Sequence, residues 1–287
     1  MASMNLSFDG VAKGTKIGSI EVDPRLRVRD DSGLPFVNKV LSGKDSAKAG
    51  FVPSTVGLFT GTPGAGKTTL ALQLCASLSD MGHEVLYNTG EESLAQVKMT
   101  YERLNLKGDF TVGADVFVDR PSGKKDAARV EQMLREHIMF LIAKVKKANS
   151  KNKKKPLDEQ KRLYIVVDSL QAMNDGKYGF KANNQTPINV LEELTQICKQ
   201  NYCGVIVIGQ VGKSGEFKGS NTLLHMVNYQ LHLYIDQDDK SITAGCRLLE
   251  CRKNRFGPTG IAVALDIGKS GLRENGVRGG DIMGRKV

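Results

Sequence analysis

Hydrophobic positions along this chain form short apolar runs that alternate with stretches of helical spacing. Leu163–Val167 (LYIVV) and Val205–Ile208 (VIVI) are continuously apolar and mostly β-branched, which is typical of strands buried on both faces of a parallel sheet. Thr55–Thr60, Glu84–Asn88 and Val116–Val118 predict three further strands.

Helical spacing fills the intervals between these runs. In the first interval Leu70, Leu74 and Leu78 fall on one helix face. The predicted helices are Lys67–Asp80, Ser93–Leu104, Ala127–Lys147 and Ile188–Lys199. Strands that alternate with helices of this length indicate βαβ units. The sequence therefore predicts an α/β fold with a mostly parallel central sheet and helices on both faces.

The pattern changes toward the end of the chain, where predicted strands follow one another with no helix between them. These strands are Tyr229–Ile235, Cys246–Cys251 and Ile261–Ile267. They are expected to add antiparallel hairpins to one side of the sheet, with residues 252–260 (RKNRFGPTG) at the tip of the second hairpin.

Three regions follow from these patterns. Residues 1–35 are polar and rich in Gly and Asp, and we expect a flexible N-terminal arm there. Residues 36–268 form the predicted core domain, and residues 269–287 a C-terminal tail.

Composition fits a protein with a real core, since 40% of the 287 residues are hydrophobic. No apolar run approaches the roughly 20 residues that span a bilayer. The first residues, MASMNLSFDGVAKGTK, lack the apolar core of a signal peptide, so we expect a cytoplasmic protein without membrane contact. The five cysteines form no CxxC pair, and we interpret them as small core residues.

A net charge of +10 favours polyanionic partners, nucleic acid first, because surface cations displace counterions from phosphate backbones. Part of this excess comes from the lysine-rich run between Lys144 and Lys155. We interpret that run as a solvated basic linker.

The residues GTPGAGKT, at positions 61–68, match the pattern G-x-x-x-x-G-K-[ST] between a predicted strand and a predicted helix. Glycines let backbone N–H groups surround a β-phosphate, and the helix N-terminus adds partial positive charge. Lys67 is expected to reach the β- and γ-phosphates, and the Thr68 hydroxyl to bind Mg²⁺. The predicted nucleotide-binding residues are Gly61, Thr62, Pro63, Gly64, Ala65, Gly66, Lys67, Thr68 and Thr69. The expected cofactors are ATP and Mg²⁺.

Acidic residues end two of the predicted strands. Asp168 closes LYIVVD and is expected to complete the magnesium site. Glu91 and Glu92 follow the second strand, where a base could activate water beside the γ-phosphate. The pair could equally complement the dipole of the next helix, and spacing alone leaves both roles open.

Five segments together resemble the ATPase core of the RadA/Sms recombination proteins, which are RecA-like motors related to DnaB-type helicases and KaiC. The segments are GTPGAGKTTLALQL, VLYNTGEESLAQVKMTYERL, YIVVDSLQAM, HMV and KNRFG. The resemblance runs from about Phe36 to about Ile267, and GEES combined with KNRFG is its most specific part. It implies a RecA-like P-loop ATPase core over residues 36–268.

The resemblance also implies catalytic roles. Glu91 would be the catalytic base, with Glu92 as a possible second, and Gln210 a polar sensor of the γ-phosphate. Lys253 and Arg255 of KNRFG would act between subunits, either on the γ-phosphate of a neighbour or on DNA.

Residues 169–187 and 211–220 match the two loops that line the nucleic-acid channel of such motors. In the second loop, Lys213 and Lys218 would contact phosphates. The expected partners are single-stranded DNA and further copies of the chain, in a hexameric ring or a filament.

The chain departs from the RadA pattern in two ways. The family's HMVD reads HMVN at residues 225–228, so its acid is absent. Neither a four-cysteine zinc module nor a protease-like domain is recognisable, since no cysteine precedes Cys75 and about twenty residues follow Ile267. The resemblance therefore covers the core only and favours a minimal, phage-type relative.

The leading functional hypothesis is an ATP-hydrolysing, single-stranded-DNA-binding motor or recombination factor in DNA recombination, repair or replication. One alternative is a KaiC-like regulatory or scaffold ATPase that acts on protein partners. A small-molecule P-loop kinase is less favoured, because residues 169–187 contain no Arg that could serve a phosphate-binding lid.

Overall fold

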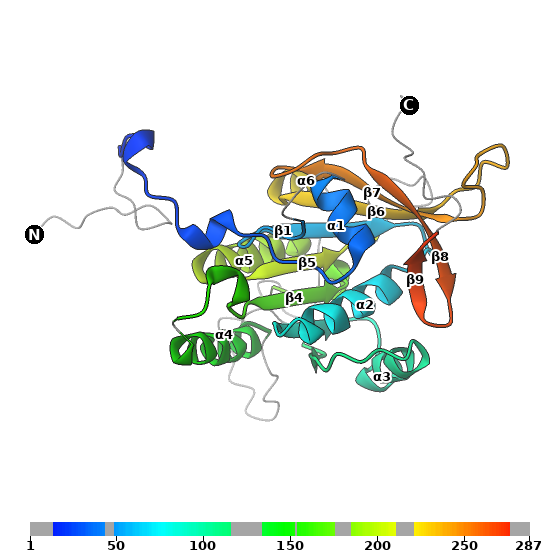
Figure 1. The fold of residues 1–287 in the computed structure, drawn as a ribbon. Coiled ribbons are helices and arrows are strands. Elements are labelled where there is room, and N and C mark those ends of the chain that lie inside the picture. Colours follow the sequence, from blue (N-terminus) through cyan, green and yellow to red (C-terminus); the bar gives the residue numbers. More distant parts are fainter. Residues whose placement is uncertain are drawn as a thin grey trace, which may run out of the picture.

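The centre of the molecule is one mixed β-sheet with helices on both faces (Figure 1). The structure is a computed structural model and describes residues 14–43, 49–115, 134–152, 154–175, 185–210 and 221–275. Across these residues the strand order is β3-β2-β4-β5-β1-β6-β7-β8-β9. The strands are β1 (Val56–Gly61), β2 (Glu84–Thr89), β3 (Thr111–Gly113), β4 (Leu163–Asp168), β5 (Gly204–Ile208), β6 (Tyr229–Ile235), β7 (Arg247–Asn254), β8 (Ala262–Gly268) and β9 (Gly271–Glu274).

The strands from β3 to β6 in this order are parallel to one another. β4 and β5 lie inside the sheet and are buried along their whole length, as their continuous apolar runs predict. The predicted parallel sheet is thereby confirmed. Parallel strands end at the same side of a sheet, which we call the carboxyl edge; the opposite side, where they begin, is the amino edge. β1, β2, β4 and β5 therefore deliver the residues that follow them to one place.

Helices cover the two faces in two groups. The helices are α1 (Pro35–Ser42), α2 (Lys67–Asp80), α3 (Leu94–Arg103), α4 (Leu134–Lys151), α5 (Thr186–Asn201) and α6 (Asn221–Met226). Buried residues of α1, α2 and α3 belong to one hydrophobic cluster, and those of α4, α5 and α6 belong to a second on the other face. The predicted arrangement with helices on both faces is confirmed.

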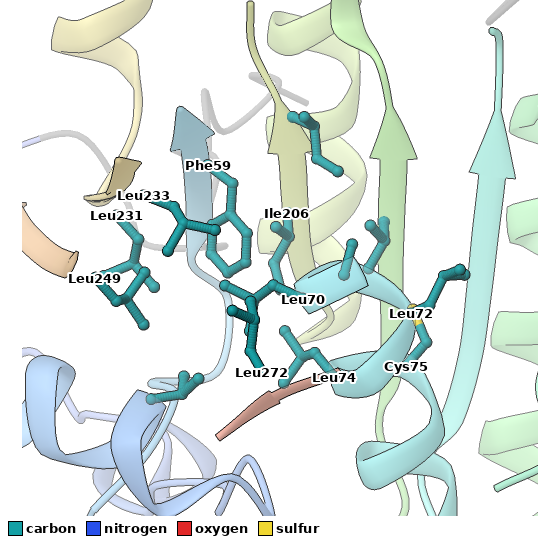
Figure 2. Packing of buried hydrophobic residues seen from close by; sticks show 14 of the residues in the cluster. Phe59, Leu70, Leu72, Leu74, Cys75, Ile206, Leu231, Leu233, Leu249 and Leu272 are labelled. Carbon is teal, nitrogen blue, oxygen red and sulfur yellow. The ribbon is translucent and has the colours of Figure 1, made fainter. Parts of the chain in front are cut away.

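Alternation along the strands separates the two clusters. In β4, Tyr164 and Val166 join the cluster around α2, whereas Ile165 and Val167 join the one around α4 and α5. Figure 2 shows the first cluster, where Leu70 of α2 lies close to Phe59 of β1 and Ile206 of β5. Burying a leucine of this kind contributes about 1.5–3 kcal/mol, so α2 is firmly fixed on the sheet that carries the site.

The antiparallel strands extend the sheet beyond β6, as predicted. β9 is an addition, since residues 269–287 were expected to form a tail. Leu272 of β9 is only 3% exposed and packs in the cluster around α2. The Gln73 side chain of α2 accepts a hydrogen bond from Leu272 N at 2.8 Å and donates one to Leu272 O at 3.0 Å. A polar side chain inside α2 therefore binds a strand that is too short for a clear sequence pattern.

The expected flexible arm, residues 1–35, is described only from residue 14, and its final part is fixed to the core. Asp30 is 3% exposed and forms an ion pair with Arg162, which precedes β4. It also accepts a hydrogen bond from the Tyr164 hydroxyl at 2.6 Å. Residues 17–27, with two short 3₁₀ turns, have no buried side chain. The expectation of a loose arm is therefore wrong for Asp30, because its partners lie far away in sequence.

Two other expectations need adjustment. The strand expected at Val116–Val118 lies outside the described residues, and the strand beside β2 is instead β3. The helix expected over Ala127–Lys147 is described from Leu134 and continues to Lys151, so the first part of the lysine-rich run is helix and not linker.

All five cysteines are buried and unpaired, as expected for core residues. In the part of the chain that the structure describes, no helix is long and apolar enough to cross a membrane.

Candidate active site

The loop between β1 and α2 lies at the carboxyl edge and contains the glycines of the predicted nucleotide-binding motif. Gly64 and Gly66 adopt positive φ angles of 76° and 107°, which disfavour any residue with a Cβ. At Gly61 a Cβ would lie 2.1 Å from the Leu233 carbonyl oxygen of β6, so glycine is required for a different reason. The motif therefore forms a tight loop, and α2 begins directly after it at Lys67.

Lys67 is the first residue of α2, and its side chain contacts this loop. Its ammonium group donates hydrogen bonds to the carbonyl oxygens of Gly61 at 2.9 Å and Thr62 at 3.2 Å. Partial burial lowers the Lys67 pKa, while the carboxylates of Asp168 and Glu91 act in the opposite direction. The cation is thus held at the loop where a phosphate chain would bind.

Asp168, the last residue of β4, meets Thr68 of α2. The Thr68 hydroxyl donates to Asp168 Oδ2 at 2.9 Å, and the Tyr87 hydroxyl of β2 donates to the same oxygen at 2.8 Å. Burial raises the Asp168 pKa, and these two hydrogen bonds partly offset that effect. The peptide bond after Asp168 is cis. A buried carboxylate beside a threonine hydroxyl presents the hard oxygen ligands that Mg²⁺ prefers.

Glu91 and Glu92 follow β2, the strand next to β4. Glu91 accepts hydrogen bonds from the Ser169 hydroxyl and, at 2.9 Å, from Gln210 Nε2, so Gln210 after β5 meets Glu91 as a pair. Glu92 Oε2 is buried without a partner among the described residues, and burial raises the Glu92 pKa, with further contributions from Asp168 and Glu91. The capping of α3 comes from Ser93 and Gln96 instead. Neither acid is therefore needed as the helix cap.

The tip cations, Lys253 and Arg255, lie at the opposite side of the sheet. β7 runs antiparallel to β6, and its last residue, Asn254, pairs with Tyr229 at the start of β6. Lys253 Nζ donates to the Leu224 carbonyl oxygen, and Arg255 Nη2 donates to the His225 carbonyl oxygen at 2.8 Å. Both cations therefore contact the end of α6 at the amino edge, away from the phosphate-binding loop of their own chain.

The predicted nucleic-acid loops cannot be placed. Lys213 and Lys218 lie outside the described residues, as does most of the stretch 169–187. Of that stretch the structure describes residues 169–175 and 185–187.

Several site residues escaped the sequence analysis. The Tyr87 hydroxyl donates a hydrogen bond to Asp168, and the Ser169 hydroxyl donates one to Glu91. Gln171 Oε1 accepts a hydrogen bond from Gln210 N at 3.4 Å. Ser169 and Gln171 directly follow the strand that ends in Asp168, a position that could have suggested them. Arg247, the first residue of β7, donates from Nε to the Ala65 carbonyl oxygen at 3.2 Å. No local pattern connects Arg247 to the loop, because 182 residues separate the two.

A glycine-rich loop at a helix start, a strand-end aspartate bound to its threonine and a Glu–Gln pair from the ends of β2 and β5, the two strands that flank β4, define a RecA-like P-loop ATPase domain. Comparison with known proteins places the chain more closely. The model of the AAA domain family matches residues 36–216, and the chain belongs to that family.

Several curated relatives of the chain are named DNA repair protein RadA. The protein of Brucella abortus is 28% identical over 265 residues, which cover 92% of this chain and 48% of the relative. The protein of Haemophilus influenzae is 30% identical over 276 residues, which cover 95% and 51%. The chain thus spans about half the length of these relatives, and the resemblance to RadA is confirmed.

Solved structures support the fold. A KaiC-like protein from Pyrococcus horikoshii superposes with a TM-score of 0.60 at 18% identity, covering 86% of this chain and 98% of that one. A second solved structure, described as an ATPase domain, gives a TM-score of 0.55 at 15% identity, covering 78% and 86%. At these identities the likeness concerns the architecture, and the predicted RecA-like fold is confirmed.

Proposed function

We propose that this protein hydrolyses ATP with Mg²⁺ and uses the energy to act on single-stranded DNA in recombination, repair or replication. The observation that carries the proposal is the hydrogen bond of 2.9 Å between Gln210 Nε2 and Glu91 at the carboxyl edge that also holds Lys67 and Asp168. A base and a sensor in contact beside a phosphate-binding loop are the parts that nucleotide hydrolysis needs.

Each side chain has a distinct task in this proposal. The loop amides and Lys67 bind the β- and γ-phosphates, where positive charge stabilises the transferred phosphoryl group. Thr68 and Asp168 would hold Mg²⁺, which neutralises charge that develops on the phosphates. Glu91 accepts the proton of the attacking water, and Ser169 and Gln210 orient its carboxylate.

Gln210 would link hydrolysis to DNA. It ends the described segment after β5, directly before residues 211–220, which we propose as a DNA-contacting loop with Lys213 and Lys218. α6 follows that loop, and the carbonyl groups at its end bind the tip cations. In this proposal a change at Gln210 would pass to residues 211–220, and α6, which follows them in the chain, contacts Lys253 and Arg255.

Oligomerisation belongs to the same proposal. The tip cations lie at the amino edge, so they cannot reach the phosphate loop of their own chain at the carboxyl edge. We propose that they act on the γ-phosphate of a neighbouring subunit or on DNA. The subunits would form a ring or a filament, and the protein would be cytoplasmic. The names of the RadA relatives support a role in DNA repair.

The test is steady-state ATP hydrolysis with and without single-stranded DNA, at low and high salt, with Lys67→Ala as the inactive control. We expect DNA to stimulate hydrolysis and salt to reduce the stimulation, because phosphate contacts release counterions. Hydrolysis that ignores DNA at every salt concentration would contradict the DNA role and favour a regulatory ATPase. Normal turnover by Lys67→Ala would contradict the assignment of the nucleotide site.

A further inference from the structure

The outer surface of α4 carries a stripe that the proposed site does not use. Phe140, Lys144, Lys147 and Lys151 are spaced by four, three and four residues, which places them on one helix face. Phe140 is 68% exposed, and the Lys144 side chain is 57% exposed. Lys147 and Lys151 are also exposed. We call these four residues the α4 stripe.

The α4 stripe is exposed although α4 itself is well packed. Leu134, Ile138, Leu141 and Ile142 point from α4 into the core, and none is more than 4% exposed. The apolar side of α4 is therefore already used against the sheet. The ring of Phe140 on the outer side contributes nothing to that packing and is accessible to a partner.

Positive charge dominates the surroundings of the stripe. Lys154 and Lys155 follow α4 and are exposed. Among the described residues, ion pairs in this region join Lys144 to Glu84 at 2.7 Å and Lys155 to Glu159 at 3.9 Å, whereas Lys147, Lys151 and Lys154 have no acidic partner. Uncompensated cations on a protein of net charge +10 form a surface suited to a polyanion.

The combination of cations with one ring favours a single nucleic-acid strand. Such strands bind through lysines along the phosphate backbone and aromatic rings on which exposed bases stack. The stripe is about 16 Å long at 1.5 Å per residue, enough for several phosphates. A membrane-binding helix would instead need a broad apolar face toward the lipid, and that face of α4 lies in the core.

We propose that the α4 stripe binds single-stranded nucleic acid, with its lysines on phosphates and Phe140 stacked on a base. Lys144 lies over the start of β2, and its partner Glu84 is the first residue of that strand. Lys144 therefore lies at the amino edge, which is the side of the sheet where the tip cations also lie. The choice of DNA over RNA rests on the proposed function, but the surface itself does not depend on ATP hydrolysis.

The absence of tryptophan from the chain makes a specific probe possible. Phe140→Trp places a single tryptophan on the stripe, and the matched control Met99→Trp places it on α3, where Met99 is also 68% exposed. Oligo(dT) should strongly quench the tryptophan fluorescence of the Phe140→Trp variant through stacking and leave that of the Met99→Trp variant unchanged. Binding is followed in parallel by the anisotropy of a labelled oligo(dT).

Two results would overturn the inference. In the first, the anisotropy of labelled oligo(dT) shows that it binds, but the tryptophan fluorescence of the Phe140→Trp variant does not change. The other is a response of that variant to anionic vesicles but not to oligo(dT), which would indicate a lipid surface. Either result can occur while DNA still stimulates ATP hydrolysis, so the inference can fail although the proposed function holds. Quenching in the Phe140→Trp variant with hydrolysis indifferent to DNA would instead support the stripe and contradict the proposed motor.

A charge variant tests the lysines separately. Lys147→Ala/Lys151→Ala should lower the slope of log affinity against log salt by about 1.4, since each phosphate contact on a single strand contributes about 0.7. Lys98→Ala/Lys107→Ala removes two lysines near α3 and should leave the slope unchanged. DNA-independent hydrolysis should be normal in both variants. An equal loss in both would show a general charge effect and overturn the assignment to α4.

Discussion

At the scale of single residues, two neighbouring acids at the carboxyl edge differ in their partners. Glu91 is held by a serine hydroxyl and a glutamine amide, both of which donate to its carboxylate. Glu92 has a buried oxygen with no partner among the described residues and a raised pKa. Of the two acids, Glu91 is the one in contact with the proposed sensor. Glu91 is therefore the better candidate for the base.

Glu91→Gln should reduce ATP hydrolysis by at least about 100-fold, because general-base catalysis typically contributes 10²–10⁴-fold. ATP affinity should persist, since the phosphate loop is untouched. Glu92→Gln is the matched control and should stay within about tenfold of the wild type. Single-turnover hydrolysis combined with equilibrium ATP binding separates the two. The reverse order of the two variants would move the base to Glu92.

Asp168 provides a prediction about pH and stability. Its folded-state pKa is raised above the ordinary 3.8, so ionisation costs stability that is fully regained below that ordinary value. Asp168→Asn stays neutral and can still accept from Thr68 and Tyr87. The nucleotide-free variant should therefore be more stable than the wild type at pH 7, and the difference should vanish as the pH falls below about 4. Urea unfolding across pH measures this, and a less stable variant at pH 7 would contradict it.

At the scale of elements, the segment before α1 is attached to β4 by a buried ion pair. The side chains of Arg162 and Asp30 are 4% and 1% exposed, and the Tyr164 hydroxyl completes the cluster. A second Asp–Arg pair on the same segment, Asp23 with Arg25, has side chains that are 26% and 41% exposed. The same chemistry thus occurs in two environments within one short stretch.

Asp30→Ala should lower the free energy of unfolding by about 3–5 kcal/mol, because it leaves a buried arginine without its partner. Asp23→Ala should cost about 0–1 kcal/mol, as exposed ion pairs do. Urea unfolding at neutral pH compares the two directly. Equal losses would show that burial does not govern these pairs.

Elements with a repeating pattern could be predicted from the sequence, and those defined by distant contacts could not. The runs of β4 and β5 and the helical spacing of α2 are local, so their positions were predicted closely. β9 is held by Gln73, and Asp30 by Arg162, each more than a hundred residues away along the chain. The same contrast holds for the site, where the phosphate loop is a local motif, whereas the bond from Arg247 to that loop joins distant segments.

At the scale of the whole molecule, the two edges of the sheet separate two sets of charged residues. The carboxyl edge holds Lys67, Asp168 and Glu91, and the amino edge holds the tip cations. β7 connects the two, since Arg247 at its start bonds to the phosphate loop and Lys253 lies near its end. One chain therefore presents a nucleotide site on one side and its candidate trans-acting cations on the other.

Mixing Arg255→Ala with wild-type subunits tests action between subunits. An equal mixture should lose clearly more than half of its hydrolysis if Arg255 serves a neighbour's site. Arg252→Ala is the control, because Arg252 lies three residues before Arg255, near the end of β7, and pairs with Glu250 at 2.9 Å. A loss strictly proportional to the mutant fraction would place the action of Arg255 within one subunit or on DNA.

Because its native cysteines are buried, the protein is suitable for labelling at a single engineered cysteine. Burial raises the pKa of Cys203 to about 12 and that of Cys251 to about 11, so neither forms the reactive thiolate at neutral pH. A maleimide dye would therefore react with one engineered surface cysteine and leave the five native thiols unmodified. Conversely, the slow labelling of the wild type would report how often the core opens, because a native thiol reacts only when it is exposed.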